Sequence, residues 1–171
     1  MTTRRLFLGA AAAALIARPL LAVSEEVVEI SMGGRADGSH VWFDPIGLLV
    51  PVGATLRWTN KDPGNAHTST AYHPDIFGRQ ARIPEGATPW DSDYLLPGES
   101  FTVTLTVPGI YDFYCVPHEH AGMVGRIVVG EAGPGYPDIE PDAKLTGLPD
   151  IALANLPDVD AILASGRVRK E

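Results

Sequence analysis

The chain has 171 residues, a formal net charge of −8 and a hydrophobic fraction of 45%, a composition that excludes a wholly disordered or collagen-like protein. The acidity argues against nucleic acid as a partner, because phosphate binding requires a basic surface. A single cysteine excludes an intrachain disulfide bond.

Residues 1–22 are predicted to be an export signal outside the fold. Arg4-Arg5 precede Phe7-Leu8 and a short apolar run that ends at Arg18-Pro19, and this layout indicates a signal of the twin-arginine type. An ordinary secretory signal is the alternative; a spanning helix is disfavoured because the apolar run is short. We expect a periplasmic or otherwise extracytoplasmic protein cleaved after Ala22, and an uncleaved signal would anchor it to the membrane. Cleavage would change the net charge to −11, because it removes three arginines and no acid.

Residues 23–131 are expected to form one β domain of short strands. The clearest strand alternates Phe101, Val103 and Leu105 with threonines, which is the period of a strand with one buried face. No helical pattern of useful length occurs between residues 27 and 129, so we expect an antiparallel sandwich or barrel. The expected strands cover residues 27–32, 46–50, 56–59, 101–107, 110–115 and 125–129.

Residues 60–98 form a long segment that is rich in Pro, Gly, Asp and His and poor in apolar runs. A loop of this length in a compact domain is usually functional. It contains His67, which directly follows Asn65-Ala66.

Residues 132–171 begin with a linker rich in Pro and Gly and continue as an acidic tail. Pro157 to Ala164 predicts one short helix, with Pro157 in its first turn and Gly166 just past its end. A frayed terminal segment is the alternative interpretation.

The chemistry-bearing residues lie in one loop between two expected strands, with the spacing Cys-x2-His-x4-Met. These are Cys115, His118 and Met123, and His67 lies upstream. A thiolate, two imidazoles and a thioether form a soft ligand set that suits copper, in the trigonal geometry with a weak axial Met that is typical of blue-copper sites. Such a set leaves no position open for a substrate, which argues against catalysis at the metal.

Two blocks of sequence resemble a known family. The first is Cys115-Val116-Pro117-His118, followed by Gly122-Met123 and 125–129; the second is 53–60, followed by His67-Thr68. Together they resemble the cupredoxin family, in its plastocyanin and pseudoazurin branch, over roughly residues 27–130.

The resemblance implies a Greek-key β-sandwich that binds one copper ion, cycling between Cu(I) and Cu(II), through His67, Cys115, His118 and Met123. It implies a mobile one-electron carrier whose electron port is His118, ringed by small apolar groups that include Pro117, Ala121 and Gly122. Expected partners are redox proteins such as cytochromes or a membrane-bound redox complex, with no small-molecule substrate and a monomeric state. The excess of acidic residues is expected to steer the protein towards a basic partner.

Copper storage, delivery or sensing is the alternative function, since His73 and His120 provide extra donors. An enzyme is disfavoured, because a copper oxidase or nitrite reductase needs further copper centres and the chain has five histidines. His40, His73 and His120 are expected to be surface groups. We expect the copper loop to be extended, so that His118 and His120 point apart.

Overall fold

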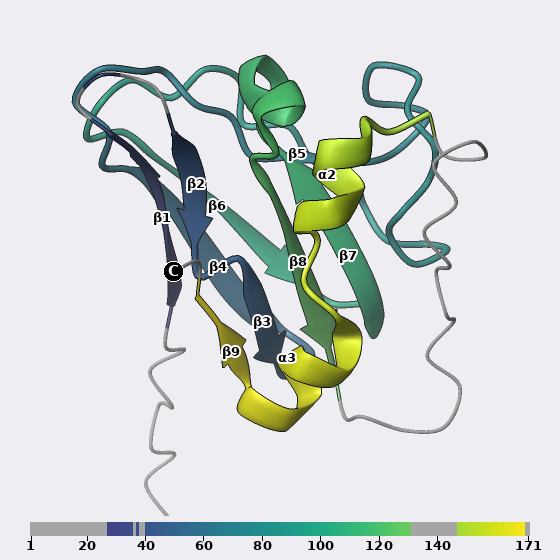
Figure 1. The fold of residues 1–171 in the computed structure, drawn as a ribbon. Coiled ribbons are helices and arrows are strands. Elements are labelled where there is room, and N and C mark those ends of the chain that lie inside the picture. The colour runs from purple at the N-terminus through teal and green to yellow at the C-terminus, as the bar shows by residue number, and fades with distance from the viewer. Residues whose placement is uncertain (1–26, 36, 38–39, 131–146, 170–171) are drawn as a thin grey trace, which may run out of the picture.

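The computed structural model describes residues 27–35, 37, 40–130 and 147–169, and it shows two β-sheets packed face to face (Figure 1). The predicted all-β sandwich is confirmed. The expected export signal and the expected linker that opens at residue 132 lie outside the described residues. Within the described part of the chain, no helix is long and apolar enough to cross a membrane.

The first sheet has four strands in the order β2-β1-β4-β6. Strand β1 (Val28–Gly34) runs antiparallel to β2 (Val41–Asp44) and parallel to β4 (Ala54–Asn60), and β4 pairs antiparallel with β6 (Ser100–Leu105). Buried and more exposed residues alternate strictly along β4. This alternation is expected of a sheet with one face on the core and one towards solvent.

The second sheet has five strands in the order β5-β7-β8-β3-β9. Strand β7 (Gly109–Tyr114) pairs antiparallel with β5 (Thr70–Ala71) and β8 (Val124–Val129). Strand β3 (Gly47–Val50) is parallel to β8 and antiparallel to β9 (Arg167–Val168). The parallel pairs in both sheets show that the chain crosses repeatedly between them, as in a Greek-key sandwich.

The core between the sheets centres on aromatic side chains. Trp58 of the first sheet meets Phe113 of the second edge-on, with ring centroids 5.4 Å apart, and Phe43 meets Phe113 at 4.8 Å. Such edge-to-face pairs add about 0.5–1.5 kcal/mol to the free energy gained from burial. Cys115 and Met123 belong to the same buried cluster, so the predicted ligands are fixed at one end of a tightly packed core.

The C-terminal residues cover the outer face of the second sheet. Helix α2 (Asp150–Asn155) packs against β8 and the loop that precedes it, and α3 (Val159–Ser165) packs against β3 and β8 (Figure 1). All residues of β7 and β8 are therefore buried, on both faces. The side chains that close this layer are Leu148, Ala152 and Ile162.

The structure differs from the sequence-based expectation in four short elements, three strands and one helix. The six expected strands correspond to β1, β3, β4, β6, β7 and β8, while β2, β5 and β9 were not expected. The helix expected from Pro157 to Ala164 corresponds to α3, but α2 was not expected. Residues 147–169 are not a frayed tail, since they pack on the sheet.

Candidate metal centre

The loop between β7 and β8 is a short 3-10 helix, η1 (Val116–Ala121), that closes on itself through backbone hydrogen bonds. The Cys115 N–H donates to the carbonyl of Met123 at 3.0 Å, and the Met123 N–H donates to the carbonyl of His118 at 3.1 Å. The expectation of an extended loop is wrong, because Pro117 near the start and Gly122 at the end favour a helical turn. The backbone thus ties together the three predicted ligands of this loop.

His67 belongs to a different segment of the chain, and its side chain lies beside Cys115. It follows β4 and pairs with Leu95, with backbone hydrogen bonds of 3.1 Å and 2.8 Å in the two directions. Both backbone groups of His67 are used in this bridge, and its side chain is fully buried. The expected long loop, residues 60–98, therefore positions one of the predicted ligands.

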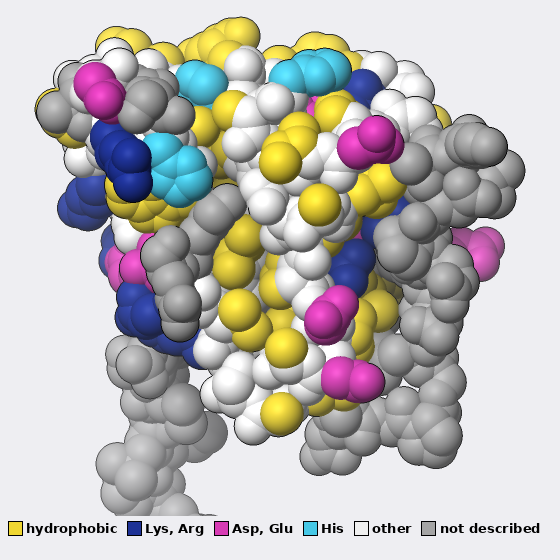
Figure 2. Space-filling view, viewed as in Figure 1, with side chains coloured by type: hydrophobic (Ala, Val, Ile, Leu, Met, Phe, Trp, Pro, Cys, Tyr) yellow, Lys and Arg dark blue, Asp and Glu magenta, His cyan; other side chains and the backbone are white. Residues whose placement is uncertain are grey.

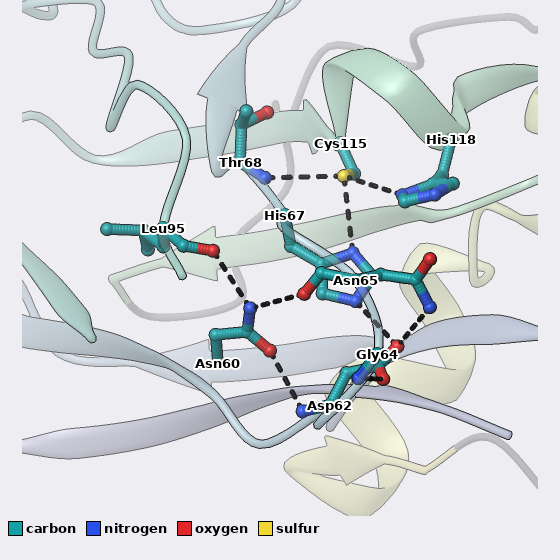
Figure 3. A network of polar contacts seen from close by, with 9 residues as sticks. All are labelled: Asn60, Asp62, Gly64, Asn65, His67, Thr68, Leu95, Cys115 and His118. Carbon is teal, nitrogen blue, oxygen red and sulfur yellow. Dashed lines mark hydrogen bonds and ion pairs between the residues drawn. The ribbon is translucent and has the colours of Figure 1, made fainter. Parts of the chain in front are cut away.

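Three donor atoms converge without any group between them. The Sγ atom of Cys115 lies 3.6 Å from Nδ1 of His67 and 3.4 Å from Nδ1 of His118, and the three atoms lie within 4.8 Å of one another (Figure 3). With bonds of about 2.3 Å to sulfur and 2.0–2.1 Å to nitrogen, a tetrahedral ion separates such atoms by about 3.6 Å. The donor set therefore fits a single small metal ion.

Met123 is completely buried directly beside this cluster. Its backbone pairs with Cys115 and His118, so its position along the chain is fixed relative to both. The role of its thioether as a weak axial ligand stays a prediction from the sequence and the resemblance.

The sulfur of Cys115 accepts a hydrogen bond from the backbone N–H of Thr68 at 3.3 Å. Burial raises the pKa of this thiol to about 11, although the Thr68 and His118 N–H groups act in the opposite direction. The thiol is thus protonated at neutral pH without a cation, and a metal must displace the proton to bind thiolate.

The hydroxyl of Thr68 links the two ligand-bearing segments. Thr68 Oγ1 accepts the Val116 N–H at 2.8 Å and lies 2.8 Å from Thr70 Oγ1, which itself donates to Asp91 at 2.6 Å. Since the Thr70 proton points to Asp91, Thr68 must be the donor to Thr70. Sequence reasoning missed this chain of hydrogen bonds, because nothing in the sequence pairs Thr68 with Val116.

The two imidazoles are suited to bind metal at neutral pH. Burial lowers the pKa of His67, partly opposed by its contact with Asp62, and burial together with His67 lowers the pKa of His118. Both rings are therefore neutral at pH 7 and offer a free lone pair, as metal binding requires.

Asp62 is the second functional residue that sequence reasoning missed. Its Oδ2 lies 3.1 Å from Nε2 of His67, and both side chains are completely buried (Figure 3). Burial opposes the ionisation of Asp62, but hydrogen bonds from Asn65, the Gly64 N–H and His67 bring its pKa below the ordinary value. A carboxylate thus lies on the far side of a predicted ligand.

The other three histidines take no part in the cluster. His120 is exposed, His73 contacts Asp75, and His40 stacks on Trp42 with ring centroids 5.4 Å apart. Within the described residues, the grouping of potential metal donors consists of His67, Cys115 and His118.

Comparison with known sequences decides the family. Residues 28–130 match the family described as copper binding proteins, plastocyanin/azurin family. The chain belongs to this family. It is 39% identical over 125 residues to a chloroplastic plastocyanin of Oryza sativa subsp. indica, covering 71% of this chain and 75% of that protein.

Solved cupredoxin structures agree. A pseudoazurin from Sinorhizobium meliloti is 29% identical and superposes with a TM-score of 0.53, covering 82% of this chain and 98% of that one. A pseudoazurin from Methylobacterium extorquens AM1, 24% identical, superposes with a TM-score of 0.54 over 81% of this chain and 98% of that one, and shares the fold.

The surface of this cupredoxin around His118 combines η1 with the C-terminal segment. Pro117 and Ala121 are exposed beside the partly exposed His118, and Figure 2 shows hydrophobic and histidine side chains together at the end of the molecule where η1 lies. Gly122 is buried against Asn155 and Ile151 of α2. The expectation that Gly122 contributes to this surface is therefore wrong; Ile151, 45% exposed, lies there instead.

Proposed function

We propose that this protein is a type 1 copper protein that carries one electron at a time between redox partners outside the cytoplasm. The observation that supports this most directly is the convergence of one Cys sulfur and two His nitrogens within 4.8 Å at the end of a packed β-sandwich. Copper bound there would supply a one-electron couple between Cu(I) and Cu(II). His67, Cys115, His118 and Met123 are the proposed ligands.

The protein's part is to keep the ligand atoms in nearly the same place in both oxidation states. Cys115 continues directly from β7, Met123 leads into β8, and His67 is fixed by its bridge to Leu95. Packed strands and hydrogen-bonded turns change little when one charge is added, so little reorganisation opposes electron transfer.

The surface supports transient docking rather than catalysis. His118 is partly exposed and connects the buried site to solvent, flanked by Pro117 and Ala121. A small patch of this kind suits brief contact with another redox protein, such as a cytochrome or a membrane-bound complex. A monomer without a small-molecule substrate and without enzymatic activity is consistent with this design.

Extracytoplasmic localisation is part of the proposal. Residues 1–22 have the composition of an export signal, with Arg4-Arg5 as the twin-arginine element. The lone cysteine is buried, so it is protected from the oxidants outside the cytoplasm.

The deciding experiment is a visible absorption and electron paramagnetic resonance spectrum of the full chain loaded with Cu(II). We expect an intense blue thiolate-to-copper band with narrow copper hyperfine splitting, absent in Cys115→Ser. His120→Ala and His73→Ala are matched controls and should leave the band intact.

A pale copper signal that survives Cys115→Ser and disappears in His120→Ala or His73→Ala would overturn the proposal. Copper would then occupy surface histidines, and storage, delivery or sensing of copper would become the better assignment.

A further inference from the structure

His67 has two ring nitrogens with different neighbours. Nδ1 faces Sγ of Cys115 at 3.6 Å, and Nε2 faces Oδ2 of Asp62 at 3.1 Å. With metal on Nδ1, the ring must carry its proton on Nε2 and donate it to the carboxylate. This inference rests on the proposed copper site. We propose that Asp62 is a positioning residue that orients His67. Through its negative charge, Asp62 lowers the reduction potential of the site relative to the value that a neutral hydrogen-bond acceptor would give.

The Asp62 carboxylate is fixed by hydrogen bonds on every side. The Gly64 N–H donates to Oδ1 at 2.8 Å, and the Asn65 amide donates to Oδ2 at 2.8 Å. The backbone N–H of Asp62 donates to Asn60 Oδ1 at 2.8 Å, while the Asn60 amide bonds the carbonyls of Asn65 and Leu95, each at 2.8 Å. The carboxylate is therefore locked in the orientation that meets His67 (Figure 3).

The neighbouring strand leaves room for this group and no more. A Cβ atom at Gly34 of β1 would lie 1.8 Å from Asp62 Oδ2. The site for the carboxylate is thus formed by three parts of the chain, namely β1, the turn after β4 and the bridge at Leu95.

No arginine or lysine among the described residues pairs with Asp62, and the side chain that contacts it opposite the metal cluster is the neutral ring of His67. An ionised carboxylate that is buried without a cation is costly to maintain. A metal ion bound to the other side of the ring would supply the missing positive charge. The charge of Asp62 therefore links the His67–Asp62 pair to metal binding.

The electrostatic consequence depends on the oxidation state. A carboxylate that accepts the distal N–H of a metal-bound imidazole makes that ring a stronger donor. In a buried site its charge also attracts Cu(II) more strongly than Cu(I), because the interaction scales with the ion's charge. Asp62 therefore stabilises the oxidised state more, which lowers the reduction potential.

The test is the reduction potential of Asp62→Asn, measured together with the Cu(II) and Cu(I) affinities of the full chain. The Asn oxygen can still accept from His67 and Asn65, while its amide group replaces the oxygen that accepts the Gly64 N–H, so the variant loses the negative charge and one hydrogen bond. Substitution of such outer ligand partners costs about 10–100-fold in metal affinity, and we expect this loss for Cu(II) but not for Cu(I). Each tenfold loss of Cu(II) affinity relative to Cu(I) affinity raises the reduction potential by about 59 mV for a one-electron couple.

The matched control is Asp75→Asn, because Asp75 also contacts a histidine, His73, but lies 79% exposed and outside the metal cluster. We expect no shift of the potential in this variant. A potential in Asp62→Asn equal to that of Asp75→Asn, with the blue band intact in both, would overturn the inference while leaving the proposed function in place. Absence of a blue band in the unmodified protein would overturn both.

A second variant should shift the reduction potential in the opposite direction, and it tests the role of Asp62 if Asp62→Asn does not fold. Asn65→Leu removes the donor that shares Oδ2 with His67, which leaves more negative charge facing the ring. We expect the potential to fall. An unchanged or raised potential would contradict the role of Asp62, since a general loosening of the site has no reason to lower it.

Discussion

Asn155 of α2 donates a hydrogen bond from Nδ2 to the backbone carbonyl of Gly122 at 2.9 Å. Gly122 adopts a left-handed conformation, with φ of 76°, at the end of η1 and directly precedes the predicted axial ligand Met123. A Cβ at Gly122 would lie 2.1 Å from that same amide nitrogen. The C-terminal segment thus braces the loop that carries three of the four proposed ligands.

Asn155→Ala should remove this hydrogen bond and make the loop around Gly122 less rigid. We expect the free energy of unfolding of the metal-free protein to fall by about 1 kcal/mol and backbone amide exchange at Met123 to become faster. Urea unfolding and hydrogen exchange measure the two effects. The control is Ser165→Ala, which removes a hydrogen bond to Ala161 within α3; equal exchange at Met123 in both variants would show that the brace does not act on the loop.

Thr68→Val should destabilise the protein although it preserves shape. The substitution leaves the partly buried Val116 N–H without its acceptor, which costs about 1 kcal/mol. The control is Thr68→Ser, which retains the hydroxyl and should be the more stable of the two in urea unfolding. A Val variant as stable as the Ser variant would mean that Val116 finds another acceptor.

Alkaline pH should unfold the metal-free protein. Burial raises the pKa of the Tyr114 phenol to about 12, despite the nearby Arg79, whereas the phenol has a pKa of about 10 in an unfolded chain. The stability that depends on the neutral phenol is fully present below pH 10 and is lost as the pH rises towards 12. Each such group contributes a slope of up to about 1.4 kcal/mol per pH unit.

Urea unfolding between pH 8 and pH 11.5 measures this slope, and Tyr114→Phe should make it shallower. Tyr94, which is 55% exposed, provides the control: Tyr94→Phe should leave the slope unchanged. If the free energy of unfolding depends on pH with the same slope in the unmodified protein and in Tyr114→Phe, other groups cause the alkaline unfolding.

Most strands of the sandwich were predictable because their hydrophobic patterns reflect which of their faces are buried. Strand β6 alternates, since one face is more buried than the other, and β8 ends in the apolar run 127–129, since α2 and α3 cover its outer side. Strands β2 and β5 escaped prediction because four and two residues are too few to establish a period.

The donor cluster was predictable because Cys115, His118 and Met123 lie within nine residues and have distinctive chemistry. The groups around the donors were not, because their roles depend on contacts across the fold. Asp62, in Asp62-Pro63-Gly64, has the composition of an ordinary turn, and its carboxylate meets His67 only once Asn60 and Leu95 fix the backbone. The same holds for Thr68, whose partner Val116 is 48 residues away.

Strand β9 also has a consequence for how copies of the protein meet one another. Backbone hydrogen bonds from Ile46 and Leu49 end on the carbonyls of Val168 and Gly166, each at 2.9 Å. Without the last described residues, β3 would present unpaired N–H and C=O groups along an apolar strand, which is the template for edge-to-edge aggregation. The C-terminal strand therefore occupies this edge of β3, so that β3 cannot pair with a strand of another copy while β9 is in place.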